Sequence, residues 1–148
     1  MFTLIFGFTG CSLEISNHKK LSFRCQSNYT VDLYDVNSSV DVYTENDFVS
    51  YINRKNIYSA KWEDVDADKL YQKLEEDKKI MERINLIITY NIDRIGNDLT
   101  SNLIMEFNSN NLDKLMDDDL SSLINDSKIK ENDYKQYLQN KGYVCVDA

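Results

Sequence analysis

Apolar and polar residues alternate along the first 43 residues of the chain, and this alternation constrains the fold more than any other feature. A period of two places successive side chains on opposite faces of a strand, so the pattern predicts half-buried strands. The predicted breaks between these strands are residues 7–10, 17–19, 26–28 and 36–39. With these breaks, apolar residues on neighbouring strands fall on one face. Residues 1–44 are therefore predicted to form a five-stranded antiparallel β-meander.

The opposite face of this predicted sheet is polar. It would carry Arg24, Tyr34 and Tyr43 together with several serines and aspartates. Because an antiparallel sheet with one apolar face must bury that face, we expect helices from the rest of the chain to cover it.

The longest predicted helix runs near residues 66–95. No proline interrupts it, and Leu70, Leu74, Met81 and Ile88 fall on one stripe of helical spacing. Such a helix would be roughly 45 Å long, which exceeds what the sheet needs. One end could therefore project and meet a partner or a second copy of the chain. The alternatives are a break near Asn85 and a helix that packs diagonally across the sheet.

Helical spacing also predicts the other carboxyl-terminal elements. A capping-box pattern at 44–47 predicts a short helix to about Lys55, and further helices are expected at 99–107, at 112–124 and around 134–138. Gly142 is placed to end the last helix, before an edge strand at 143–146. The sequence thus predicts a single α+β domain over residues 1–148, with a β-meander at 1–44 and a mainly helical region at 45–148.

The three cysteines and the first residues bear on the compartment. The chain has an odd number of cysteines, Cys11, Cys25 and Cys145, and no C-x-x-C spacing. Both features argue against a disulfide framework and a zinc knuckle. Cys11 and Cys25 are expected to pack as free thiols on the inner face. The apolar start lacks a basic region and is too short to span a bilayer. We therefore expect a cytoplasmic protein with no membrane contact.

Four carboxylates follow the spacing of a calcium-binding loop: Asp64, Asp66, Asp68 and Glu75 occupy positions one, three, five and twelve. The sixth position, which requires glycine, is Lys69. The alternative is that Asp64 and Asp66 cap the long helix. Since no glycine-rich phosphate loop accompanies these residues, we expect no metal and no cofactor. A small metal-dependent enzyme using these four carboxylates is the alternative function.

The net charge of -8 is unevenly distributed. Residues 97–148 carry -5 of it, and Asp113, Asp117, Asp118 and Asp119 form its densest cluster. Such a field opposes contact with nucleic acid or anionic membrane and favours a basic protein surface. These four aspartates are the predicted partner-binding residues.

With one histidine and no nucleophile expected near it, the sequence favours binding over catalysis. We expect an acidic inhibitor that blocks a basic protein surface, such as a nuclease or a nucleic-acid-binding groove. Abundant Asn, Ile, Lys and Tyr indicate an A/T-rich genome, as phages, mobile elements and low-GC bacteria have, and we expect the protein of such a source. An anti-CRISPR protein and a toxin immunity protein both fit this description. A homo-oligomeric structural protein joined through the 66–95 helix is a further alternative.

Overall fold

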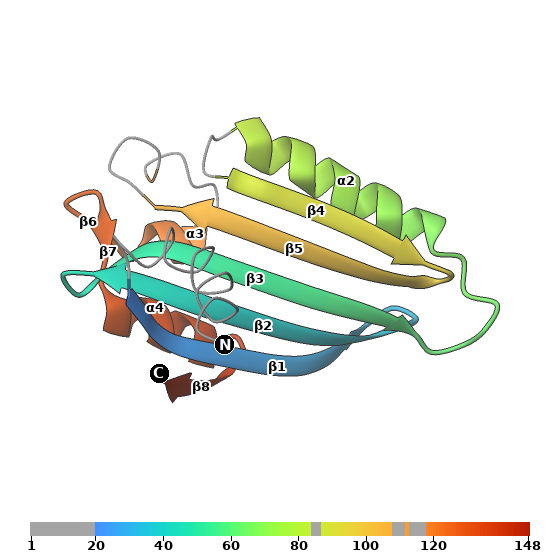
Figure 1. Ribbon diagram of the computed structural model, residues 1–148, viewed down its shortest axis with the longest axis horizontal. Helices are drawn as coiled ribbons and strands as arrows, with labels where there is room; N and C mark the ends of the chain where they lie inside the picture. Colours follow the sequence, from blue (N-terminus) through green and yellow to red (C-terminus); the bar gives the residue numbers. More distant parts are fainter. Residues whose placement is uncertain (1–19, 84–86, 108–111, 113–117) are drawn as a thin grey trace, which may run out of the picture.

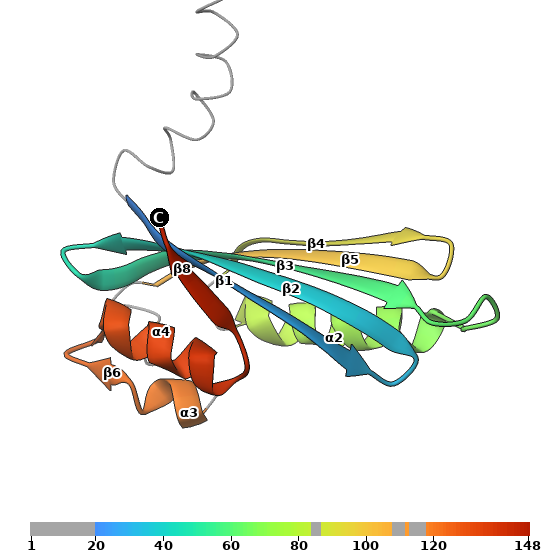
Figure 2. The ribbon, with the colours of Figure 1, turned by 90° about the horizontal axis from the view of Figure 1, so that it is seen from below.

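The computed structural model describes residues 20–83, 87–107, 112 and 118–148. Its centre is a six-stranded antiparallel sheet with the strand order β4-β5-β3-β2-β1-β8, and a second sheet pairs β6 with β7. The helices of the described residues all lie on one face of the large sheet, while the other face is open in this part of the chain (Figures 1 and 2).

The elements follow one another in a simple order along the chain. They are β1 (Lys20–Val31), β2 (Tyr34–Glu45), β3 (Phe48–Ala60), α2 (Asp68–Arg83), β4 (Ile87–Ile95), β5 (Asp98–Glu106), α3 (Asp118–Ser121), β6 (Ile124–Asn125), β7 (Lys128–Ile129), α4 (Glu131–Asn140) and β8 (Val144–Asp147).

Two-residue turns connect the long strands into hairpins. Asn46 and Asp47, between β2 and β3, both adopt positive φ angles, as a type I′ turn requires. Gly96 supplies the positive φ of 62° between β4 and β5, and Asp32 supplies that between β1 and β2. Asparagine, aspartate and glycine tolerate this conformation better than other residues, which is why the chain reverses at these points.

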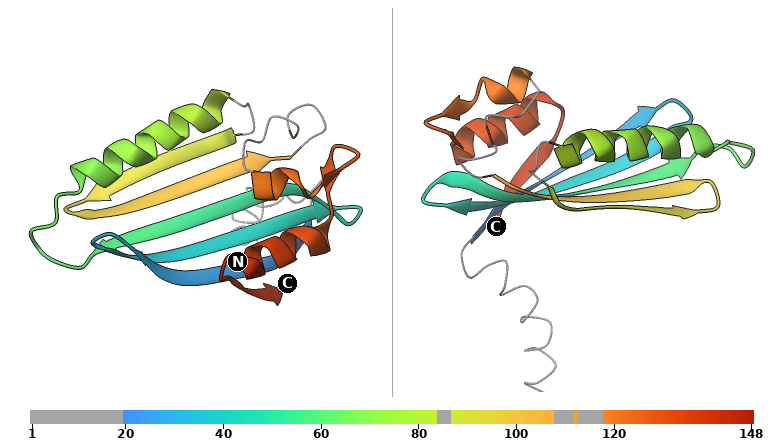
Figure 3. Two further views of the ribbon diagram at one scale, coloured as in Figure 1. Left: turned by 180° about the vertical axis from the view of Figure 1, so that it is seen from behind. Right: turned by 90° about the horizontal axis from the view of Figure 1, so that it is seen from above.

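The covered face of the sheet holds two hydrophobic clusters. The first lies beneath α4 and includes Phe23, Val42, Ile52 and Ile129, each fully buried. The second lies beneath α2 and includes Tyr34, Val36, Leu74 and Leu99. The helices α2 and α4 cover opposite ends of the same face (Figure 3).

The predicted fold class is confirmed in its coarse form: the chain is α+β with a large antiparallel sheet, but that sheet draws strands from the whole described chain, Lys20–Val31 to Val144–Asp147. The predicted strand limits are wrong where they can be compared. Residues 26–28 lie inside β1 and residues 36–39 inside β2, so two predicted loops are continuous strand. The predicted breaks at 7–10 and 17–19 lie outside the described residues.

Cross-strand hydrogen bonds explain why these polar stretches remain in strands. Asn37 Nδ2 donates to Asn28 Oδ1 at 2.7 Å on the open face. On the covered face, the Ser38 hydroxyl donates to Asn56 Oδ1 at 2.5 Å and lies 2.7 Å from the Tyr143 hydroxyl. Because these pairs satisfy polar side chains within the sheet, serine and asparagine do not interrupt it.

The region after residue 44 is not mainly helical, contrary to the prediction. The expected helices at 44–55 and 99–107 are β3 and β5, and the expected helix at 66–95 ends at Arg83, with β4 beginning at Ile87. In β4, Tyr90 and Ile92 face the core at a period of two, and β-branched residues dominate the segment. The argument for a dimer through a projecting helix therefore no longer applies.

The carboxyl-terminal predictions hold better. A helix is present at Glu131–Asn140 and β8 follows it, with Gly142 between them at a φ of 95°. Of the expected helix at 112–124, the described residues contain α3 at Asp118–Ser121.

Two side-chain predictions are also corrected. Tyr34 lies on the covered face and is buried, whereas Arg24 and Tyr43 do lie on the open face as expected. Cys25 is joined to Cys145 by a disulfide instead of packing as a free thiol. The pairing was missed because the two cysteines are 120 residues apart, and strand β8 brings them together beside β1. Disulfides persist in oxidising compartments, so this bond argues against a reducing compartment such as the cytoplasm. Cytoplasmic localisation stays a prediction.

In the described part of the chain, no helix has both the length and the apolar character needed to cross a bilayer.

Candidate protein-interaction surface

The predicted aspartate cluster is largely beyond what the structure describes. Asp113 and Asp117 lie outside the described residues. Asp118 and Asp119 begin the short helix α3, but the placement of their side chains is not among the described features. Partner binding by these four residues stays a prediction.

The four carboxylates with calcium-loop spacing do not form a metal site. Asp64 and Asp66 lie in the connection before α2, whereas Asp68 and Glu75 belong to that helix. Among the described residues, no three acidic, histidine or cysteine side chains are grouped closely enough to hold a metal ion. Asp66 Oδ1 instead accepts the Asp68 backbone N–H at 2.9 Å, which caps the start of the helix as the alternative expected.

Three connections meet at the end of the sheet where α2 begins. We call this region the loop end and define it as residues 31–35, 60–68 and 93–98. It contains the β1–β2 turn, the β3–α2 connection and the β4–β5 turn, all at the right of Figure 1.

Hydrogen bonds join the three connections to one another. The Lys61 N–H donates to the Leu33 carbonyl oxygen at 2.9 Å, which links the first turn to the β3–α2 connection. Asn97 Nδ2 donates to the Glu63 carbonyl oxygen at 2.8 Å, and the Ala60 N–H donates to Asp98 Oδ1 at 2.9 Å. The relative positions of the three connections are therefore set before any partner arrives.

Buried side chains hold the longest connection, residues 60–68, against the domain. Val65 and Ala67 point into the cluster beneath α2 and are buried, so the connection is packed onto the domain. A segment held both by packing and by hydrogen bonds loses little conformational entropy when it binds. The loop end is thus preorganised.

Each connection displays one large apolar side chain to solvent. Leu33 is 50% exposed, Trp62 is 63% exposed and Ile95 is 82% exposed. Trp62 is the single tryptophan of the chain. Scattered apolar residues on a surface need no explanation, but three on adjoining connections at one end make this region a candidate interaction surface.

Carboxylates surround these apolar residues. The loop end contains eight acidic and two basic residues. Both basic residues are paired: Lys61 Nζ lies 3.9 Å from Asp35 Oδ1, and Arg94 bonds Asp68. The bond with Asp68 raises the pKa of Arg94, so this cation stays charged. Six carboxylates have no ion pair within the described residues: Asp32, Glu63, Asp64, Asp66, Asp93 and Asp98.

Sequence reasoning missed the loop end because its three parts are far apart in the chain. The local signals were nevertheless present. Gly96-Asn97 between two β-branched runs is a hairpin signal, but the helix predicted near residues 66–95 runs up to this pair. Trp62 falls between the helices predicted at 44–55 and 66–95, so no role is predicted for it.

Comparison with known proteins gives no further guide to function: no family model, no curated protein and no solved structure matches this chain.

Proposed function

We propose that this protein is a non-enzymatic binding protein that docks through its loop end on a basic protein surface and blocks it. The observation that carries the proposal is the combination of three exposed apolar side chains with unpaired carboxylates on connections that are already fixed in place. The partner chemistry is that expected from the sequence, while the proposed contact moves from the Asp113–Asp119 region to the loop end.

The apolar residues would supply most of the affinity. Binding energy in protein interfaces concentrates in a few residues near the centre, and tryptophan is the residue most enriched there. In sequence, Trp62 comes between the other two connections, and its side chain is exposed in the free protein. Its burial in a pocket of the partner, flanked by Leu33 and Ile95, is the contact that we expect to dominate.

The carboxylates would supply orientation and speed. A surface with six unpaired negative charges attracts a positive patch over several ångströms and raises the association rate, an effect that salt weakens. Basic grooves that bind nucleic acid present such a patch. A nuclease or nucleic-acid-binding effector is therefore the proposed partner class, with an anti-CRISPR or toxin immunity role as its two settings.

Affinity capture with charge-matched variants tests this proposal. The wild-type protein, immobilised at low salt, should capture one basic protein from the native host, and high salt should release it. Glu63→Lys combined with Asp64→Lys should abolish the capture, because both side chains are exposed at the loop end.

The matched control is Glu76→Lys combined with Glu82→Lys, which makes the same change in net charge on exposed positions of α2. It should capture the partner as the wild type does. A third variant, Asp118→Lys with Asp119→Lys, tests whether the predicted aspartate cluster takes part in binding. Capture lost in this third variant but kept in the loop-end variant would overturn the loop end as the contact.

A further inference from the structure

A polar row crosses the covered face of the sheet between the two hydrophobic clusters. Ser27 pairs with Ser38 across β1 and β2, Ser38 pairs with Asn56 on β3, and Asn56 pairs with Ser101 on β5. Ser38 is fully buried and Ser101 is 4% exposed. Since buried polar side chains lower stability unless they are bonded, a row of them within a core suggests a purpose besides packing.

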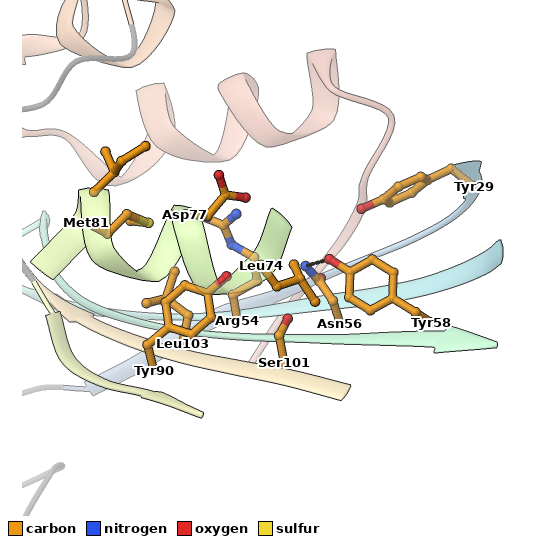
Figure 4. Close-up of a pocket in the computed structure, with 11 residues that line it drawn as sticks. Tyr29, Arg54, Asn56, Tyr58, Leu74, Asp77, Met81, Tyr90, Ser101 and Leu103 are labelled. Atoms are coloured by element: carbon orange, nitrogen blue, oxygen red, sulfur yellow. Dashed lines mark hydrogen bonds between the residues drawn. The ribbon is translucent and has the colours of Figure 1, made fainter. Parts of the chain in front are cut away.

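One end of this row opens into a cavity of about 300 Å³ between α2 and the sheet (Figure 4). Arg54 and Asn56 on β3 line it together with Ser101 on β5 and Tyr90 on β4. The apolar part of the wall includes Leu74 and Met81 of α2 and Leu103 of β5. The volume lies at the lower end of the range for small-molecule sites.

Two donors in this cavity lack a protein acceptor. Ser38 and Tyr58 satisfy Asn56, but no side-chain hydrogen bond or ion pair within the described residues involves Arg54 or Ser101. Asp77 on α2 also lines the cavity, yet it is exposed and its carboxylate is more than 4.0 Å from the guanidinium. A half-buried guanidinium without an anion is a ready partner for a carboxylate.

Tyr90 adds a third donor. Burial raises the pKa of Tyr90 to about 12, and the carboxylate of Asp77 acts in the same direction. Its hydroxyl therefore stays protonated at neutral pH and can donate a hydrogen bond.

We propose that this cavity binds a small organic monocarboxylate, with the carboxylate on Arg54 and Ser101 and the apolar body against Leu74, Met81 and Leu103. A single negative charge is favoured because Asp77 repels an anion of higher charge. The site is separate from the loop end, so it can exist whether or not the proposed docking occurs.

Calorimetric titration with benzoate, octanoate and inorganic phosphate as probes tests the site. At least one carboxylate should bind saturably to the wild type, and phosphate should bind more weakly than that carboxylate. Arg54→Gln should weaken carboxylate binding by at least about tenfold. Lys55→Gln removes the same charge from the next residue, which is exposed on the opposite face of β3, and should leave the affinity unchanged.

Two further variants keep the result interpretable. Arg54→Lys retains the positive charge and should bind the carboxylate better than Arg54→Gln, which separates loss of charge from loss of fold. Asp77→Asn should strengthen binding by a few fold because it removes a repulsive charge. The proposal is overturned if no carboxylate binds, if Arg54→Gln binds as well as the wild type, if phosphate binds more tightly, or if Asp77→Asn weakens binding.

Discussion

The two ends of the sheet differ in where their apolar side chains lie, although the α4 end also exposes Val144 and Val146 on the edge strand β8. At the α4 end, helix α4 and the disulfide to β8 enclose Phe23 and Ile129, which have no exposed surface. At the loop end, Leu33, Trp62 and Ile95 face solvent, while Tyr34, Val65 and Ala67 from the same connections are buried. We therefore expect the core at the α4 end to contribute most to stability, and the exposed residues of the loop end to contribute little to it.

A substitution at Phe23 tests this comparison between the two ends most directly. Phe23→Ala should lower the free energy of unfolding by about 3–5 kcal/mol, because it removes a fully buried ring that also lies 5.2 Å from Lys135 Nζ. Trp62→Ala should change the free energy of unfolding by no more than about 0.5 kcal/mol. Urea denaturation measures both. Similar losses in the two variants would contradict the assigned division between the ends.

The disulfide should stabilise the α4 end without affecting recognition. Replacing Cys25 and Cys145 together by alanine should lower the free energy of unfolding by about 2–5 kcal/mol, because the bond closes a loop of 120 residues in the unfolded chain. The folded fraction of this variant should still capture the partner. Denaturation of the oxidised wild type and of the variant, followed by capture at low salt, makes the comparison. Loss of capture by the folded variant would link the two ends.

Replacing Trp62 should weaken partner binding although it leaves the free energy of unfolding nearly unchanged. Trp62→Ala should weaken the captured complex by about 2 kcal/mol or more, as expected for a tryptophan that becomes buried in an interface. Ile57→Ala is the control, since Ile57 is an exposed apolar residue on the open face of β3. Surface plasmon resonance measures both dissociation constants. Equal effects at the two positions would remove the special role of Trp62.

The two positive-φ glycines give a smaller and sharper contrast. A methyl group at Gly96 meets no atom within 4 Å, so Gly96→Ala should cost about 1 kcal/mol of conformational strain without steric overlap. Gly142→Ala should cost a similar amount at the α4 end. Only the change at Gly96, which is adjacent to Ile95, should weaken partner binding. Thermal unfolding and binding measured together on both variants check this.

Tyr90 provides a further test, through its titration. Because burial raises the pKa of Tyr90 to about 12, above the ordinary value of a tyrosine, the unfolded chain loses this proton first as pH rises. The stabilising difference is complete below about pH 10 and is lost between about pH 10 and 12. Ultraviolet titration should detect a tyrosine of high pKa that is absent in Tyr90→Phe. An unchanged titration curve would show that Tyr90 is not buried as described.

The predictability of the fold from sequence differed between these ends as well. Helix α4 and β8 were predicted because the signals for them, Tyr134, Leu138 and Gly142, lie within a short stretch of chain. At the centre, Ile84 and Ile88 fit a helical stripe equally well, and only pairing with β5 makes the second of them part of a strand. Local spacing cannot represent a partner strand that is distant in sequence, so β3, β4 and β5 were assigned to helices.

The same reason limited prediction of the site. Excess negative charge can be seen in the composition, and a basic partner stays a prediction from it, but the three connections of the loop end are more than 60 residues apart at their extremes. Lys61 meets Leu33, and Asn97 meets Glu63, only because β3 lies between β2 and β5. The disulfide between Cys25 and Cys145 was hidden in the same way.

Fluorine NMR of the protein labelled with fluorotryptophan tests the central claim most directly, because Trp62 is the one tryptophan of the chain and gives a single resonance. In the free protein, the resonance should show the solvent sensitivity of an exposed ring. On addition of the captured partner it should shift and become protected from solvent, and high salt should reverse the change. A resonance that stays unchanged while the complex forms would contradict docking through the loop end.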